Sequence, residues 1–334
     1  MSKVQIAFFS AYSYEIEIFE RENKKHGFAI QFYREHLSEQ TAHLAQGKEA
    51  VCCFVKDNLS QKIIERLYRE KVQLIALRAT GFDHVDIAAA KGKLKIVNVP
   101  AYSPQSIAEH AIALMLMLLR KIPLSYLRGR ENNFSLDGLL GTTLYGKTVG
   151  LIGMGNIGRA TAKILNGFQT SLLVYDIVCD PALEKELAFS YVDLKTLFNS
   201  CDILSLHCPL SDKTHYLIDE QAIASMRDGV ILINTARGAI VKTAALIQGL
   251  KSKKIGGAGL DVYEREQSLF FEDLSGTQLY DQEFSTLRSF PNVVITPHQA
   301  FFTKEALEQI AQITLHNIAQ FSQGIALSNE VIAY

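Results

Sequence analysis

Three glycines stand where the phosphates of a dinucleotide could bind. Gly153, Gly155 and Gly158 follow an apolar run and open a helix-like stretch. The first permits a sharp exit from a strand, the second lets a pyrophosphate approach the backbone, and the third lets the helix pack closely on the sheet. Backbone amides from Asn156 and Ile157 onward, together with the helix dipole, can then hold the phosphate charge.

Asp176 adds a preference for one cofactor. It ends a second apolar run, where a carboxylate can accept hydrogen bonds from the hydroxyls of the adenosine ribose. A 2'-phosphate would meet a negative charge at this place and is better matched by an arginine. Residues 149–176 therefore predict a site for NAD rather than NADP, against the simpler alternative of a structural glycine turn.

The composition indicates a globular protein without a basic surface. The 334 residues exceed the usual size of one core, so two domains are expected. The formal net charge is −1 and the charges are spread along the chain, which predicts neither a nucleic acid nor a membrane as partner. The five cysteines lack CxxC spacing, so we expect no disulfide framework and no metal, and reduced thiols fit the cytoplasm. We also expect no targeting segment.

Short apolar runs alternate with helix-like stretches on both sides of the glycine turn. This alternation is typical of parallel sheets whose strands are joined by helices. It predicts the α/β fold class, with two doubly wound parallel sheets. The strands of the first sheet are expected at 4–9, 28–33, 50–55, 72–77 and 94–99, and those of the second at 148–153, 171–176, 202–207, 230–236, 257–262 and 292–296.

Two helices and one loop complete this outline. Pro104 opens a helix that Ser103 can cap. Its run 107–119 is apolar on nearly all sides, so we expect it to be buried all round, either in the core alone or also at a subunit contact. The segment 303–324 has helical periodicity and ends on a glycine suited to a C-cap. Residues 267–281 are expected to form a long functional loop.

Six strings of the sequence carry a family resemblance. They are AYSPQSIAEHA, YGKTVGLIGMGNIG, LHCPLSDKT, INTARGAIV, GLDVYERE and TPHQAFFT. Through them the chain resembles the D-isomer-specific 2-hydroxyacid dehydrogenases, most closely the fermentative D-lactate dehydrogenases. The resemblance runs from about Tyr102 to the C-terminus, and RATGFDHVD supports it in the first part of the chain.

The resemblance also implies a division into domains. A Rossmann-type NAD-binding domain, residues 102–299, would be inserted in a flavodoxin-like substrate domain made of residues 1–101 and 300–334. This division agrees with the alternation of strands and helices described above. We further expect a homo-oligomer, either a dimer or a tetramer.

Three residues match the family's catalytic positions. Arg237 follows an apolar strand, and its planar guanidinium can bind the carboxylate and carbonyl oxygens of a 2-keto acid together. His298 matches the general base of alcohol oxidation, which becomes the acid in reduction, because imidazole has a pKa near the working pH. Glu266 would hydrogen-bond the far ring nitrogen of His298, which fixes the tautomer and favours the protonated form.

Further residues match family positions that touch the cofactor. The carboxylate of Asp261 would lie near the nicotinamide carboxamide and orient the ring, although the carboxylate of an isolated aspartate at a strand end is often only a cap. His207 is expected to be an orienting or packing residue rather than a second base. The remaining contacts, largely through the backbone, are Cys208, Pro209, Thr214, Thr235 and Ala236.

The substrate contacts implied by the resemblance come from other parts of the chain. Backbone amides of Ala79, Thr80 and Gly81 would grip the carboxylate, and the hydroxyl of Tyr102 would add a hydrogen bond. Arg237 and His298 would complete this set. Aromatic side chains would limit the space around C3 of the substrate. The alternative for each of them is that it only packs in the core. These walls are Phe301 and, with less support, Phe54.

These inferences predict reversible hydride transfer between NADH and pyruvate, giving D-lactate, in the cleft between the two domains. Another D-2-hydroxy acid remains an alternative, since it requires only a wider wall. A phosphorylated substrate is disfavoured because no regulatory domain follows the last helix, and formate because the resembling formate enzymes carry glutamine at the position of Glu266. From another class, a non-enzymatic NADH-sensing corepressor remains open, although no disordered tail is expected.

Overall fold

The computed structural model describes residues 3–332, which fall into two compact units. The larger unit is Pro104–Phe301, and the smaller unit combines the residues up to Ser103 with those from Phe302 onward. The chain therefore passes between the units twice, at each point two residues later than the sequence led us to expect. We describe each unit by itself.

The smaller unit is built on a parallel five-stranded sheet of order β2-β1-β3-β4-β5. This is the flavodoxin-like order, which confirms the expected architecture. Four of the five strands are four residues long, and β3 and β4 are buried along their whole length. The strands are β1 (Gln5–Phe8), β2 (Ala29–Phe32), β3 (Ala50–Cys53), β4 (Leu74–Leu77) and β5 (Lys95–Val97).

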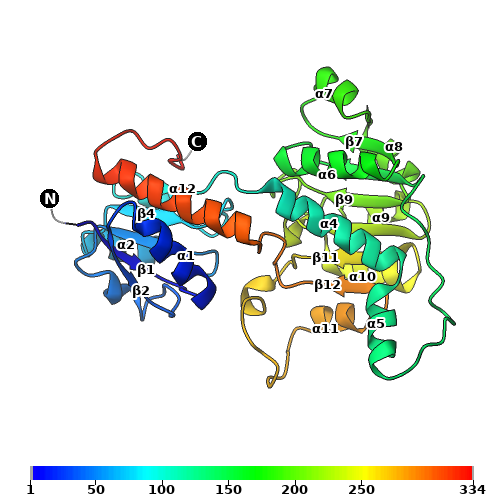
Figure 1. Cartoon of the computed structure of the whole chain (residues 1–334), viewed down its shortest axis with the longest axis horizontal. Helices are drawn as coiled ribbons and strands as arrows, with labels where there is room; N and C mark the ends of the chain where they lie inside the picture. Colours follow the sequence, from blue (N-terminus) through cyan, green and yellow to red (C-terminus); the bar gives the residue numbers. More distant parts are fainter. Residues whose placement is uncertain (1–2, 333–334) are drawn as a thin grey trace. The chain divides into compact units, whose positions relative to one another are not determined.

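Helices cover both faces of this sheet (Figure 1). On one face α12 lies against α1 and β4. Thr303 caps α12, because its hydroxyl accepts a hydrogen bond from the Ala306 amide, and Gly324 follows the helix with a φ of +67°. A glycine relieves the strain of this left-handed turn. The helices are α1 (Ser13–Asn23), η1 (Ala42–Ala45), α2 (Gln61–Arg69), α3 (Ile87–Ala90) and α12 (Lys304–Ser322).

The larger unit contains a parallel seven-stranded sheet of order β12-β11-β10-β9-β6-β7-β8. Its order reverses between β6 and β9, as in the Rossmann fold, so the expected second sheet is confirmed. Ligands of such sheets bind beyond the carboxyl ends of the strands, at the point of reversal. The strands are β6 (Thr148–Ile152), β7 (Ser171–Tyr175), β8 (Ser190–Tyr191), β9 (Ile203–Leu206), β10 (Val230–Asn234), β11 (Ile255–Leu260) and β12 (Val293–Ile295).

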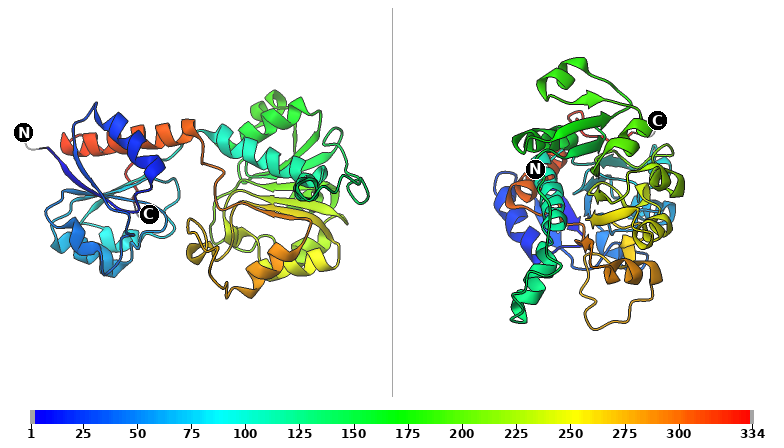
Figure 2. Two further views of the ribbon diagram at one scale, coloured as in Figure 1. Left: turned by 60° about the horizontal axis from the view of Figure 1, so that its bottom comes forward. Right: turned by 90° about the vertical axis from the view of Figure 1, so that its right-hand side faces the viewer.

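Two hydrophobic layers sandwich this sheet (Figure 2). Ile203 and Ile233 belong to the layer with α4 and α6, whereas the alternate residues Leu204 and Leu232 belong to the layer with α8, α9, α10 and α11. Side chains of a strand point to opposite faces in turn, so a strand buried on both faces is apolar throughout. The helices are α4 (Pro104–Leu119), α5 (Ile122–Arg130), α6 (Asn156–Gly167), α7 (Pro181–Glu186), α8 (Leu194–Ser200), α9 (Glu220–Ser225), η2 (Gly238–Ile240), α10 (Thr243–Lys251), η3 (Glu266–Ser268) and α11 (Gln282–Ser289).

One expectation about helix α4 was wrong. Gln105, Glu109 and Ala113 are exposed, so the helix is not buried all round. These residues are spaced by four and form one narrow stripe, which interrupts an otherwise apolar circumference. No helix among residues 3–332 is long and apolar enough to cross a membrane.

Candidate active site

The glycine turn lies at the point where the large sheet reverses its strand order. Gly153 has a φ of +97°, and a Cβ there would lie 2.7 Å from the carbonyl carbon of His207. A Cβ on Gly158 would lie 2.1 Å from the Gly153 oxygen, whereas one on Gly155 would meet no atom within 4 Å. The first and third glycines are therefore required by the fold itself. The second leaves open space at the start of α6, where a pyrophosphate would fit.

The first turn of α6 is suited to an anion. Gly155 is the N-cap of the helix, and it has no side chain that could bond to the amides of this turn. These amides, beginning with Asn156 and Ile157, point their partial positive charge toward the open space. Asp176 directly follows β7, and its carboxylate accepts hydrogen bonds from the Met154 and Val178 amides, at 2.5 and 2.9 Å. The local groups thus fit the diphosphate and ribose of NAD.

The end of strand β10, on the same edge of the sheet, carries a buried polar atom that a ligand could satisfy. The Thr235 hydroxyl, at the end of β10, is buried with no hydrogen-bond partner among the described residues. The Ala236 amide donates to the Asn234 side chain, which orders this strand end. Buried polar atoms are normally paired, so a ligand group beside Thr235 would satisfy it. The unpaired Thr235 hydroxyl and the open space beside Gly155 are the two structural observations that support a cofactor site.

The segment after β9 forms a tight turn. The Thr214 hydroxyl donates to the Pro209 carbonyl at 2.6 Å, and it accepts a hydrogen bond from the Ser211 amide at 2.8 Å. Cys208 is buried just before this turn. The imidazole of His207 lies 2.9 Å from the Ser205 hydroxyl, and burial lowers its pKa to about 4. His207 therefore stays neutral at physiological pH, as expected for a packing or orienting residue.

His298 and Glu266 form a close pair. The Nδ1 atom of His298 lies 2.7 Å from Glu266 Oε1, and the Tyr263 amide donates to Glu266 Oε2 at 2.9 Å. Both carboxylate oxygens therefore accept hydrogen bonds, so Nδ1 must carry a hydrogen and Nε2 is left for a reacting group. Burial opposes the charge of the imidazole, but the bond to Glu266 and the charges of Glu266 and Asp261 raise the pKa of His298 above its usual value.

Arg237 belongs to the same site. It follows β10, and its Nη1 atom donates to the Ala236 carbonyl at 2.8 Å. The next residue, Gly238, passes so close to the Tyr263 backbone that a Cβ would lie 2.1 Å from the Tyr263 carbonyl carbon. This close approach brings Arg237 toward the Glu266 segment. The guanidinium charge accordingly lowers the pKa of His298, against the larger effect of Glu266.

Asp261 holds the turn that carries His298. The backbone of His298 has a φ of +53°, a left-handed conformation that costs energy in a residue other than glycine. Its amide donates to the Asp261 carbonyl at 2.7 Å, while the Gln299 and Ala300 amides donate to the two Asp261 carboxylate oxygens at 2.9 and 2.8 Å. Asp261 is fully buried. The contact of this carboxylate with the nicotinamide carboxamide stays a prediction, since each carboxylate oxygen can accept more than one hydrogen bond.

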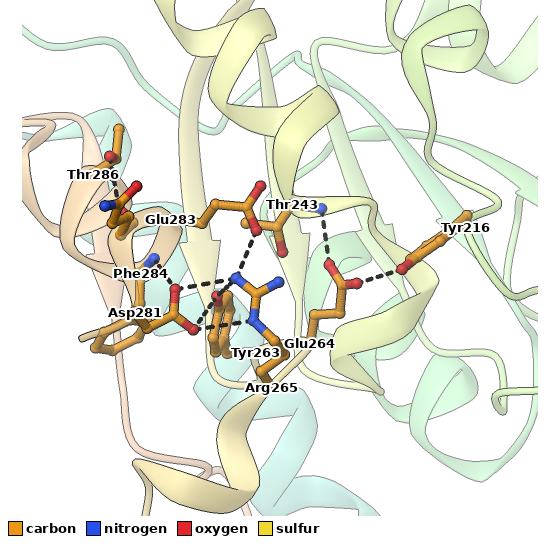
Figure 3. A network of polar contacts seen from close by, with 10 residues as sticks. Tyr216, Thr243, Tyr263, Glu264, Arg265, Asp281, Glu283, Phe284 and Thr286 are labelled. Atoms are coloured by element: carbon orange, nitrogen blue, oxygen red, sulfur yellow. Dashed lines mark hydrogen bonds and ion pairs between the residues drawn. The ribbon is translucent and has the colours of Figure 1, made fainter. Parts of the chain in front are cut away.

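A network of ion pairs fixes the segment before Glu266 (Figure 3). Arg265 reaches Asp281 at 3.1 Å and Glu283 at 2.6 Å, and the Tyr263 hydroxyl donates to Asp281 at 2.8 Å. Glu264 accepts hydrogen bonds from the Tyr216 hydroxyl and, at 3.2 Å, from the Thr243 amide. The network therefore clamps the two ends of the expected loop 267–281.

Two aromatic rings flank His298. The Phe301 ring centroid lies 6.4 Å from that of His298, and the Phe271 centroid lies 5.9 Å away. Phe301 was anticipated as a wall, but Phe271 was not. Phe271 has a φ of +65°, which is rare for a bulky side chain. Only its place in a loop after Glu266 pointed to it in the sequence.

The other expected substrate residues lie in the smaller unit. Ala79, Thr80 and Gly81 follow β4, and the Thr80 hydroxyl donates to the Val99 carbonyl at 2.8 Å. Tyr102 follows β5 and is half-buried. These residues stand near the carboxyl ends of parallel strands, the usual place for ligand contacts. Their part in substrate binding remains a proposal.

Comparison with known proteins agrees with this geometry. A family model described as "D-isomer specific 2-hydroxyacid dehydrogenase, NAD binding domain" matches residues 112–300, which is more than half of the chain. The chain belongs to this family. It is an NAD-dependent D-2-hydroxyacid dehydrogenase, and the two-domain fold agrees with that of solved relatives.

Individual relatives span the whole chain. A D-lactate dehydrogenase from Escherichia coli is 46% identical over 330 residues, which cover 98% of this chain and 100% of the relative. A structure described as the pyruvate reductase of Chlamydomonas reinhardtii has a TM-score of 0.92 at 40% identity and covers 98% of both chains. A D-lactate dehydrogenase with NAD+ from Lactobacillus jensenii has a TM-score of 0.82 at 33% identity, covering 99% of this chain and 100% of its own.

Asp176 provides a test of cofactor choice. We expect Asp176→Ser to weaken the preference for NADH over NADPH, because it removes the ribose acceptor and the charge that repels a 2'-phosphate. The ratio of kcat/KM for the two cofactors, measured with one 2-keto acid, checks this. Asp180→Ser, nearby in sequence at the start of α7, is the control. An unchanged ratio in Asp176→Ser would contradict our account of cofactor selection.

Proposed function

We propose that this dehydrogenase reduces pyruvate to D-lactate with NADH and catalyses the reverse reaction as well. One observation carries the proposal. His298 Nδ1 lies 2.7 Å from Glu266 Oε1, and the charge of Arg237 is close enough to lower the pKa of His298. Reduction of a 2-keto acid requires a guanidinium that binds the carboxylate and an imidazolium that donates a proton. The relatives named as D-lactate dehydrogenases support the choice of substrate.

Each residue has a distinct role in the proposed reaction. Arg237 binds the carboxylate and polarises the ketone, and the amides of Ala79, Thr80 and Gly81 with Tyr102 complete carboxylate binding. NADH, when bound at the glycine turn, supplies the hydride. His298 donates a proton from Nε2 to the forming alkoxide, and in the oxidation it takes this proton back. Glu266 keeps the opposite ring nitrogen protonated throughout.

We assign the cofactor residues the roles that the sequence and the family resemblance predict. The glycine turn holds the diphosphate through Asn156 and Ile157, and Asp176 binds the ribose. Asp261 lies near the nicotinamide carboxamide and also holds the turn that carries His298. Backbone groups of Cys208, Pro209, Thr214, Thr235 and Ala236 line the remaining cofactor site.

An assay with a panel of 2-keto acids tests the proposed function. NADH absorbance is followed after addition of pyruvate, 2-ketobutyrate, a branched 2-keto acid or phenylpyruvate. We expect the highest kcat/KM with pyruvate and D-lactate as product. A clear preference for a larger acid would reassign the substrate within the family. Tight NADH binding without turnover of any acid would instead support a sensor.

The raised pKa of His298 predicts a particular pH dependence. Reduction requires the imidazolium, so kcat/KM for pyruvate should fall as the pH rises through the pKa of His298, which lies above its usual value. Glu266→Gln removes the negative charge that favours the imidazolium, so we expect this midpoint to move to lower pH. Profiles of kcat/KM against pH for both proteins check the shift. Glu305→Gln, at an exposed acid of α12, is the control, and an unchanged midpoint in Glu266→Gln would refute the pairing.

We also propose that the enzyme is a homo-oligomer in the cytoplasm. Helix α5 has no buried residue, and the segment after it exposes large apolar side chains: 77% of Phe134, 82% of Leu136 and 88% of Leu140. Exposed apolar side chains clustered in one segment favour a contact with another copy. The five cysteines are all free, which agrees with a reducing compartment. Sedimentation of the purified enzyme distinguishes monomer, dimer and tetramer.

A further inference from the structure

Helix α4 packs against strand β11. Leu114 and Leu118 are spaced by four on this helix, and they face two glycines of the strand. A Cβ on Gly259 would lie 3.0 Å from Leu114 Cβ, and one on Gly257 would lie 3.4 Å from Leu118 Cδ2. Larger residues in β11 would push the helix outward. The two glycines therefore set the short distance between helix and strand.

The contact between α4 and β11 repeats every four residues of the helix and every two residues of the strand. Four residues of a helix rise by about 6 Å, and two residues of a strand by about 6.6 Å. Leu118 and Leu114 face Gly257 and Gly259, so the next step along both elements pairs residue 110 with residue 261. His110 on α4 is thereby brought to Asp261, at the carboxyl end of β11.

His110 donates a hydrogen bond to the groups around Asp261. Its Nε2 atom lies 3.0 Å from the Thr296 hydroxyl oxygen and 3.4 Å from Asp261 Oδ1. The Thr296 hydroxyl gives its own hydrogen to Asp261 Oδ1 at 2.5 Å. The hydroxyl oxygen must then accept from His110, so Nε2 carries the hydrogen. Both the neutral Nε2–H form and the imidazolium can make this bond.

The bond stabilises the charge that holds the catalytic turn. Burial opposes the charge of Asp261, but the hydrogen bonds from His110 and Thr296 keep the pKa of its carboxyl below the usual value. The charged carboxylate accepts the Gln299 and Ala300 amides, which flank His298 on its C-terminal side. The left-handed backbone of His298 therefore depends on Asp261, and Asp261 depends on His110.

We propose that His110 is a positioning residue for His298 and acts through Thr296 and Asp261. The inference depends on the proposed acid/base role of His298. Without the donor from α4, the turn 296–300 loses one constraint on its strained conformation, and Nε2 of His298 moves away from its productive place. A displacement of about 1 Å can reduce a rate by about 100-fold. His110 itself touches neither substrate nor cofactor in this proposal.

Paired substitutions separate the hydrogen bond from packing. His110→Phe keeps a flat ring without a donor, whereas His110→Gln supplies an amide hydrogen at a similar reach. Thr296→Val and Thr296→Ser make the same comparison at the partner. We expect kcat for pyruvate to fall by about 10- to 100-fold in His110→Phe and Thr296→Val, with the NADH dissociation constant unchanged, and to recover largely in His110→Gln and Thr296→Ser. Combining the two damaging changes should add little, because they break one chain of bonds.

The pH profile supplies a readout that loss of packing would not move. The groups facing His298 are Glu266, Asp261 and Arg237. A loosened Asp261 would favour the imidazolium less, so the midpoint of kcat/KM should move to lower pH in His110→Phe and in Thr296→Val. Glu109→Gln, on the exposed stripe of α4, should leave both kcat and the midpoint unchanged.

The outcomes distinguish this inference from the proposed function. Wild-type kcat and midpoint in His110→Phe, alongside an inactive His298→Gln, would overturn the inference and leave the function standing. Equal losses in His110→Phe and His110→Gln would also overturn it, since the donor would then be irrelevant. If His110→Phe lacks a thermal unfolding transition, Thr296→Val decides by the same criteria. A wild-type enzyme that turns over no 2-keto acid would overturn the function itself.

Discussion

Replacing His298 with glutamine is expected to lower kcat for pyruvate reduction by about 10²- to 10⁴-fold. The amide cannot release a proton near neutral pH, and it cannot share a charge with Glu266 as the imidazolium does. NADH binding should persist, because the glycine turn and Asp176 are not altered. Steady-state kinetics and a fluorescence titration with NADH measure the two effects separately.

A matched change elsewhere makes this result specific. His316→Gln replaces an exposed histidine of α12 in the same way and should leave kcat unchanged. Thermal unfolding of both variants shows whether the strained turn survives. A His298→Gln enzyme with nearly normal turnover would remove His298 from the acid/base role, whatever the state of the remaining site.

Replacing Arg237 with glutamine is expected to lower kcat/KM for pyruvate by about 10²- to 10³-fold. The change removes the charge that binds the carboxylate and stabilises the forming alkoxide. Arg237→Lys should recover little, because an ammonium lacks the planar fork that binds two oxygens together. Initial rates at varied pyruvate concentration give kcat and KM for each variant, and Arg288→Gln, at an exposed arginine of α11, is the control.

The pH profile gives Arg237→Gln a second and opposite signature. The guanidinium lowers the pKa of His298, so its removal should move the midpoint of kcat/KM to higher pH. Glu266→Gln should move the midpoint the other way. Shifts in the same direction for both variants would contradict the placement of these charges around one imidazole.

Much of the fold could be predicted because its causes are local. Every expected strand is present, since a buried parallel strand is a short apolar run between turn residues. The glycine turn was recognisable because two of its glycines answer steric demands of the adjacent strand and helix. The short edge strand β8, which divides the helical stretch expected between β7 and β9 into α7 and α8, escaped prediction, because brief elements with little apolar periodicity depend on their neighbours.

The candidate site was predictable only in part. Arg237, Glu266 and His298 stood out because their side chains have the chemistry of the reaction, and the resemblance supplied their order. The engagement of Asp261 with the turn 296–300 was hidden, since the chain must fold before these segments meet. The same reason concealed Phe271 and His110, whose importance comes from the residues they approach. Pairings made by tertiary packing leave no spacing to read in the sequence.

The hydrogen bond from the Tyr263 amide to Glu266 has a consequence for evolution at this position. A main-chain amide can only donate, so a glutamine at residue 266 would turn its oxygen toward Tyr263 and its NH2 group toward His298. The neutral imidazole of His298 would then carry its hydrogen on Nε2. Oxidation of an alcohol needs a lone pair on this nitrogen to take the hydroxyl proton. The fixed Tyr263 amide thus allows a glutamate at residue 266 to support both reduction and oxidation. A glutamine at the same place is suited only to reactions in which His298 exchanges no proton.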